Sequence, residues 1–326
     1  MFSRNVVSAK QVRALTDELR EISDEMPLIA IDQEGGRVWR TRPFSAGPPD
    51  AATFATLGNA MQISQFGALT GRFLDMLGIN FNLAPVLDLD HFPELKNGLR
   101  GRCWGRGSQE VIDRAGLFNR WMRKNGVLGC GKHFPGNGRA VTDTHHELPV
   151  ADCSLEELLR EDLLPYTALA PELDGILASH VNFLKLDAGV PASLSKRILT
   201  GLLRDQLGYE GLILTDDLDM GAIAKNYGRG PDVRMAVDAG ADLALICHQT
   251  ETLPEAVAAL AGVSLDRVEA TEKRLHKARK RLSRVPAFTE KAWEKANEDL
   301  RAMTKEVTGS ERFEIDGEAL SPVEEY

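Results

Sequence analysis

The sequence predicts an α/β protein, a TIM-type (β/α)₈-like barrel whose first βα unit is truncated. Its 326 residues suit a single barrel domain. Apolar runs rich in Val, Ile and Leu recur at intervals of roughly 30–50 residues, with helical patterns between most of them. None of the runs alternates cleanly between apolar and polar residues, which is typical of parallel strands buried on both faces. The runs span 27–36, 79–88, 127–136, 174–183, 211–220 and 241–249, and a weaker candidate, "PASLS" (191–195), precedes the fifth.

Every run changes from apolar to polar at its carboxyl end. These endings are Asp32-Gln33-Glu34, Asp88, Lys132-His133, Ser179-His180, Asp216-Asp217 and His248. Because the carboxyl ends of parallel strands meet at one face of a barrel, we expect these side chains to gather there. In barrel enzymes that face holds the active site.

The segments between the runs carry helix signals. Ser154 and Glu157 form a capping box ahead of an apolar stripe, and a second helix should run from Ser195 to a stop glycine, Gly208. A third helix is expected over 108–126. No linker or repeat interrupts the chain, so we predict one barrel domain over 1–285, followed by a C-terminal helix and acidic tail over 286–326.

The amino-terminal end is unusual for a barrel. A helix over 8–26 precedes the first strong strand, and only "MFSRN" is available to supply an earlier one. A barrel lacking that strand would expose a parallel edge, which is an aggregation liability. We therefore expect the C-terminal helix or a second chain to cover it, so that the protein is a monomer or a homodimer.

Composition limits the functional classes. The net charge of −9 and the pI of 5.4 argue against nucleic-acid and membrane partners. Four scattered cysteines without a CxxC pair predict reduced thiols. No segment has the length and apolarity of a signal peptide core or a bilayer span. These features predict a cytoplasmic enzyme or binding protein.

The stretch "KHFPGNGRAVTDTHHELP" (132–149) concentrates titratable groups in a segment that glycine and proline mark as a loop. A phosphate-binding loop is disfavoured, because "GVLGCGKH" has histidine where that motif needs Ser or Thr. A zinc site built from His133, His145, His146 and Asp143 remains open but lacks a helical i, i+4 pair and a nearby cysteine. A polar loop without chemistry is the plainest alternative.

Acid–base chemistry is the third interpretation of this loop. Asp143 stands two residues before His145, so its carboxylate can orient the imidazole and raise its basicity. A histidine of this kind can protonate a leaving group and later deprotonate water. Asp216, which directly follows an apolar strand, would supply the partner carboxylate, while Asp217 should point to the other side of the strand. A positioned carboxylate with a positioned acid is suited to cleaving a glycosidic bond through a covalent intermediate.

The order of several motifs resembles a known family. "AIDQEGGRVWR", "NLAPVLDLD", "RGRCWG", "KHFPGNGRAVTDTHHELP" and "LTDDLDM" follow one another as in the family-three glycoside hydrolases, within which the chain is similar to the bacterial β-N-acetylhexosaminidases. The resemblance spans about residues 1–285. It implies a retaining hydrolase that removes terminal β-linked N-acetylglucosamine from muropeptide fragments during cytoplasmic cell-wall recycling, with no metal or other cofactor.

The resemblance also implies roles for individual residues. Asp216 matches the family nucleophile, His145 its acid/base and Asp143 the partner of that histidine. The residues that match substrate-binding positions are Asp32, Arg40, Arg102, Lys132 and His133. One departure is Asn137, where the family usually has histidine. This departure and the short amino terminus keep a catalytically weakened sugar-binding relative open as an alternative, beside a β-glucosidase of the same family and a metal-dependent barrel hydrolase.

Overall fold

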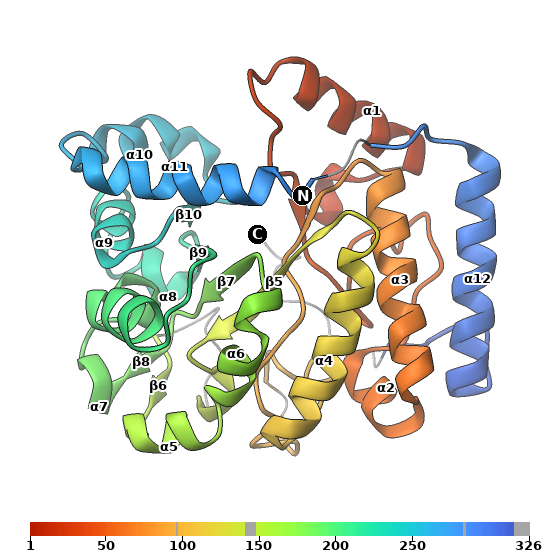
Figure 1. The fold of residues 1–326 in the computed structure, drawn as a ribbon, viewed down its shortest axis with the longest axis horizontal. Coiled ribbons are helices and arrows are strands. Elements are labelled where there is room, and N and C mark those ends of the chain that lie inside the picture. Colours follow the sequence, from red (N-terminus) through yellow and green to blue (C-terminus); the bar gives the residue numbers. More distant parts are fainter. Residues whose placement is uncertain (96, 141–147, 283–284, 316–326) are drawn as a thin grey trace.

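The computed structural model describes residues 1–95, 97–140, 148–282 and 285–315. Within them, a six-stranded parallel sheet has the order β1-β4-β5-β7-β9-β10. The sheet curls, and helices cover its outer face (Figure 1). This arrangement confirms the predicted α/β, barrel-like fold. The sheet strands are β1 Ala30–Ile31, β4 Phe81–Asn82, β5 Leu128–Phe134, β7 Gly175–Ala178, β9 Leu212–Asp217 and β10 Leu243–Leu245.

Two smaller sheets stand beside the barrel: an antiparallel pair of β2 Gln33–Gly35 with β3 Val38–Trp39, and a parallel pair of β6 Val150–Ala151 with β8 Asn182–Phe183. The α-helices are α1 Ala9–Glu21, α2 Ala51–Leu57, α3 Ala60–Met76, α4 Ser108–Arg123, α5 Leu155–Arg160, α6 Leu164–Leu169, α7 Leu184–Asp187, α8 Gly221–Ala224, α9 Pro231–Ala239, α10 Leu253–Ala259, α11 Leu265–Arg279 and α12 Glu290–Thr308. The 3₁₀-helices are η1 Ser3–Asn5, η2 Asn137–Arg139, η3 Ala170–Glu172, η4 Ala192–Leu194 and η6 Thr250–Thr252. The segment η5 Arg197–Gln206 is a π-helix.

Side chains alternate along the strands between the barrel interior and the layer beneath the helices. Leu212 and Leu214 of β9 belong to a small interior cluster with Phe81, whereas Ile213 joins the large cluster packed under the helices. Successive side chains of a strand point to opposite faces. Residues of even number on β9 therefore face the interior.

The open side of the sheet lies between β1 and β10, and the amino-terminal segment bridges it. The Met1 amino group donates to the Ala30 carbonyl of β1, while the Arg4 guanidinium donates to the Cys247 carbonyl just after β10. The Phe2 ring lies 5.0 Å from the His248 ring. Residues 1–5 thus occupy the position for which we expected the C-terminal helix or a second chain.

Helix α12 packs elsewhere, along α3 and α2 at the right edge of the molecule in Figure 1. Apolar residues at helical spacing form the buried face of this helix: Trp293, Ala296, Leu300, Met303 and Val307. The Trp293 ring lies 4.8 Å from the Phe73 ring of α3. The C-terminal helix is therefore part of the folded unit.

Two segments differ from the structure expected of them. The segment "PASLS" forms the short turn η4 rather than a strand, because β7 and β9 pair directly and leave no place between them. The capping box of Ser154 and Glu157 is confirmed, but helix α5 ends at Arg160 and the chain restarts as α6. Among the described residues, no helix combines the length and apolarity needed to cross a membrane.

Candidate active site

Strand β9 delivers Asp216 to the carboxyl end of the barrel. Asp216 follows Leu212 and Leu214 at two-residue spacing, so its side chain lies on the interior face. The carboxylate is only partly buried, and its Oδ1 accepts a hydrogen bond of 2.9 Å from the Asp217 backbone N–H. A carboxylate in this position is fixed by its own strand and still reachable by a ligand.

Lys132, near the end of β5, joins two acids that follow β1. Its Nζ lies 2.7 Å from Asp32 Oδ1 and 2.6 Å from Glu34 Oε1. The ammonium is almost fully buried, whereas Asp32 keeps 18% of its side chain exposed. Burial opposes the charge of Lys132, but the two carboxylates outweigh this effect and raise its pKa. Lys132 therefore stays charged at the floor of the site.

Two arginines complete this ionic group. The Arg102 guanidinium binds Glu34 with both Nε and Nη2 at 2.8 Å, a bidentate pair. Arg40 Nη2 lies 3.6 Å from Asp32 Oδ2. Burial alone would raise the pKa of Asp32, but Lys132 and then Arg40 lower it below its ordinary value. Glu34 follows the same pattern, with Arg102 as its strongest cationic neighbour.

His133 is oriented by Asp88, which follows β4. Asp88 Oδ2 lies 2.7 Å from His133 Nδ1, and Asp88 Oδ1 accepts the backbone N–H of Asn137 at 2.7 Å. Asp88 is fully buried, so its carboxylate fixes both the imidazole and the start of the loop after β5. The other ring nitrogen of His133 lies 3.4 Å from Arg102 Nη2.

A second histidine, His180, follows β7 and is fully buried. Its Nδ1 lies 2.7 Å from Ser193 Oγ, and its Nε2 lies 2.8 Å from the Asp217 carbonyl oxygen. Ser193 belongs to η4, so the segment wrongly predicted as a strand serves to position this ring. The Nε2 contact identifies Nε2 as the donor, because a carbonyl oxygen only accepts.

The charge of Asp216 is set by these neighbours. Burial would raise the pKa of the carboxyl group, but His133, His180 and Lys132 favour the anion and lower the pKa below its ordinary value. Asp216 is therefore ionised at neutral pH. An ionised, partly desolvated carboxylate that is held in place can act as a nucleophile.

Asp217 faces the loop after β10, as its position on the strand predicts. Its Oδ2 lies 3.2 Å from His248 Nε2, and its Oδ1 accepts the backbone N–H groups of Asp219 and Cys247. Burial, reinforced by the carboxylates of Asp219 and Asp216, raises the pKa of Asp217 to about 7. The two adjacent aspartates thus differ in charge state because they face different surroundings.

This difference predicts how stability depends on pH. A carboxyl group whose pKa is raised on folding contributes stability that is complete below about pH 4 and is lost as the pH rises through about 7. Relative to Asp217→Asn, the native chain should lose about 1.4 kcal/mol of unfolding free energy per pH unit in that window. Urea unfolding of both proteins at pH 5 and pH 7 should change their difference by about 2–3 kcal/mol. An unchanged difference would contradict the raised pKa.

The structure brings together six of the residues predicted from the sequence, namely Asp32, Arg40, Arg102, Lys132, His133 and Asp216. Asp143 and His145 lie outside the described residues. Asn137 is the first residue of η2, and its amide Oδ1 is buried without a hydrogen-bond partner in the described part of the chain. Sequence reasoning did not assign site roles to Glu34, Asp88 or His180, although all three stand at the strand ends that it had singled out.

One group of possible metal ligands occurs in the described residues, beside the site rather than in it: His91, Glu161 and Asp162. Asp162 Oδ1 lies 2.8 Å from His91 Nε2, and Arg139 binds both Asp162 and Glu161 at 2.6 Å. Because Arg139 already pairs with both carboxylates, the group is better explained as an anchor for the η2 turn. The main site, by contrast, offers carboxylates, imidazoles and fixed cations suited to polar, hydroxyl-rich ligands.

Comparison with known proteins agrees with this chemistry. The model of the glycosyl hydrolase family 3 N-terminal domain matches residues 1–285. The chain therefore belongs to glycosyl hydrolase family 3. Its α/β barrel, with an ionised carboxylate at the carboxyl end, is the scaffold of a glycoside hydrolase.

Two similar proteins are named β-hexosaminidases. The chain is 37% identical over 264 residues to a β-hexosaminidase of Methylococcus capsulatus, covering 80% of this chain and 78% of that protein. It is 36% identical over 261 residues to one of Pseudomonas aeruginosa, covering 80% and 77%.

Two solved structures are similar throughout. A family-3 β-N-acetylglucosaminidase of Paenibacillus sp. str. FPU-7 superposes with a TM-score of 0.85 at 33% identity, covering 94% of this chain. The chain spans only 62% of that protein. NagZ of Neisseria gonorrhoeae superposes with a TM-score of 0.79 at 26% identity, covering 95% of this chain and 89% of that one.

Proposed function

We propose that this protein is a retaining exo-β-N-acetylglucosaminidase. Asp216 would attack the anomeric carbon of a terminal β-linked N-acetylglucosamine, and a dyad of His145 and Asp143 would serve as acid/base. The observation that carries this proposal is the ionised Asp216 carboxylate on the interior face of β9, beside His133, His180 and Lys132. The names of the β-hexosaminidase relatives support the sugar specificity.

The reaction has two steps with opposite proton transfers. In the first, His145 protonates the glycosidic oxygen while Asp216 forms an ester with the sugar, which releases the aglycone. In the second, His145 removes a proton from water, and the ester is hydrolysed with net retention of configuration. A neutral imidazole repels an anionic acceptor less than a carboxylate would, so phosphate could replace water in this step.

The ionic group on the barrel floor suits recognition of the sugar. The ammonium group of Lys132 has three N–H donors, and Asp32 and Glu34 accept two of them. Asp32, partly exposed and held ionised, can accept hydrogen bonds from two adjacent hydroxyl groups. Arg102 would act through Glu34, because its Nε and Nη2 bind that carboxylate and its Nη1 donates to the Gly98 carbonyl.

The proposal extends to the physiological setting. Because its motifs follow the order found in the bacterial β-N-acetylhexosaminidases of this family, we infer that its substrates are N-acetylglucosaminyl muropeptide fragments met in the cytoplasm during cell-wall recycling. The alternatives within the same fold are a β-glucosidase and a sugar-binding protein with weakened catalysis, for which Asn137 is the specific observation.

Matched aryl glycosides test the proposal. We expect the purified protein, with chelator present, to hydrolyse aryl β-N-acetylglucosaminide at least about 100-fold faster, by kcat/KM, than aryl β-glucoside, a discrimination that requires polar groups made for the acetamide. Faster glucoside cleavage would favour the β-glucosidase. Saturable binding of N-acetylglucosamine by the folded protein without turnover of either glycoside would favour the weakened sugar-binding protein.

A further inference from the structure

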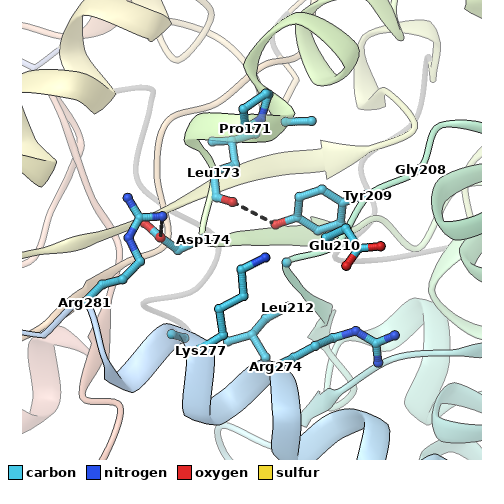
Figure 2. A pocket seen from close by; sticks show the side chains of 13 residues that line it. Pro171, Leu173, Asp174, Gly208, Tyr209, Glu210, Leu212, Arg274, Lys277 and Arg281 are labelled. Carbon is cyan, nitrogen blue, oxygen red and sulfur yellow. Dashed lines mark hydrogen bonds and ion pairs between the residues drawn. The ribbon is translucent and has the colours of Figure 1, made fainter.

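A pocket opens at the opposite end of the barrel from Asp216. It has a volume of about 260 Å³ and lies where β7 and β9 begin, against helix α11. Figure 2 shows Lys277 extending from α11 toward the space between Asp174 and Glu210. Leu212, the first residue of β9, also lines it. Asp216 is the fourth residue after Leu212 on β9, which places the pocket roughly 13 Å away along the strand.

One face of α11 and its extension supplies the basic side of this pocket. Arg274, Lys277 and Arg281 line it at spacings of three and four residues, the spacing of neighbours on a helix face. The acids that line it are Asp174 and Glu210. The lining alone thus carries one more cation than acid.

The ion pairs around the pocket increase this excess, because each buried acid is shared by several arginines. Asp174 binds Arg281 at 2.8 Å and also Arg123 at 2.9 Å. Asp242, the partner of Arg274, is fully buried. It also binds Arg204 and Arg267.

The named group therefore holds six cations and three carboxylates, a net charge of about +3 when each is fully ionised. Burial, followed by repulsion from Arg274 and Arg267, lowers the pKa of Arg204 to about 10. Such a concentration of positive charge is unusual in a chain whose net charge is −9.

We propose that this distal pocket is a binding site for a small phosphate-bearing anion, either free phosphate or a phosphate monoester. A di- or trivalent anion would balance the excess charge. Guanidinium and ammonium groups on one helix face offer the several N–H donors that a tetrahedral oxyanion requires. The volume admits a phosphate group together with a small organic substituent.

Binding of orthophosphate to the full chain tests this proposal. At low ionic strength we expect saturable binding by calorimetry and a rise in melting temperature of about 2 °C, beyond that caused by chloride of equal ionic strength. Lys277→Glu should weaken binding at least about tenfold, because it reverses a charge inside the pocket. Lys273→Glu makes the same charge change on α11 at a position that does not line the pocket, and it should bind like the native chain.

Further arms separate the possible outcomes. Arg281→Ala should also weaken binding, and it leaves Asp174 paired with Arg123. A hexose phosphate that binds more tightly than orthophosphate would identify an organic ligand, and equal affinities would identify free phosphate. Binding unchanged in both Lys277→Glu and Arg281→Ala would place phosphate elsewhere, including the catalytic end, and would overturn the proposal. An effect reproduced by chloride alone would also overturn it.

Discussion

Replacing Asp216 with alanine should reduce kcat on an aryl β-N-acetylglucosaminide by about 10⁴-fold or more, because the variant lacks the carboxylate that would form the glycosyl ester. This loss corresponds to about 5.5 kcal/mol of transition-state stabilisation. The fold should survive, because Asp216 stands on a partly exposed strand end and its loss leaves no buried ion without a partner. Steady-state kinetics with circular dichroism of both proteins provide the measurement.

Asp217→Asn is the matched control for this substitution. It alters the neighbouring aspartate, whose side chain faces the loop after β10 instead of the barrel interior. We expect it to reduce kcat by less than about tenfold, since it removes no group that contacts the substrate. Comparable losses in the two variants would refute the assignment of Asp216 as nucleophile.

Replacing His145 with alanine should have an effect that depends on the leaving group. For substrates with a poor leaving group we expect kcat/KM to fall by about 10²–10⁴-fold, the usual contribution of general acid catalysis. For a nitrophenyl glycoside, whose nitrophenolate leaving group departs without protonation, the loss in kcat/KM should be much smaller. A series of aryl N-acetylglucosaminides of graded phenol pKa measures this dependence.

The adjacent histidine supplies the control for this experiment. His146→Ala removes the same number of atoms from the neighbouring residue but should retain the native dependence on leaving-group pKa. If His145→Ala reduced kcat/KM equally for every aglycone, His145 would not be the acid, which would have to be another residue. Equal leaving-group dependence in both histidine variants would lead to the same conclusion.

The sequence predicted where chemistry gathers better than how the groups pair. Polar residues at the ends of Val/Ile/Leu-rich runs placed Asp32, Lys132 and Asp216 at one face, because parallel strands all end on the same side. Contacts across that face join residues far apart in the chain, such as Lys132 to Asp32 and His133 to Asp88. Local periodicity carries no information about such pairs.

Glu34 illustrates this limit. In the sequence it is one acid beside two glycines at the end of an apolar run. In the structure it holds both Arg102 and Lys132 in place. Its role depends on Arg102, which is 68 residues away in the chain. No local sequence pattern predicts that these two residues pair.

The shape of the barrel shows a second limit. Hydrophobic spacing predicted the strands of the sheet but not which segment would cover its open side. Arg4 and Phe2 do so through His248 and its neighbour, while α12 packs on α3 because Trp293 finds an aromatic partner there. Likewise "PASLS" is apolar enough for a strand, yet Ser193 is needed to hold His180.

The central claim is that Asp216 forms a covalent bond to the sugar, and trapping that intermediate tests it most directly. The protein would be incubated with a fluorinated N-acetylglucosaminyl fluoride, which slows hydrolysis of the ester more than its formation, and its peptides would be analysed by mass spectrometry. We predict one equivalent of sugar on the peptide containing Asp216, and none in Asp216→Ala. Labelling of a different carboxylate, or turnover with inversion at the anomeric carbon, would contradict the account.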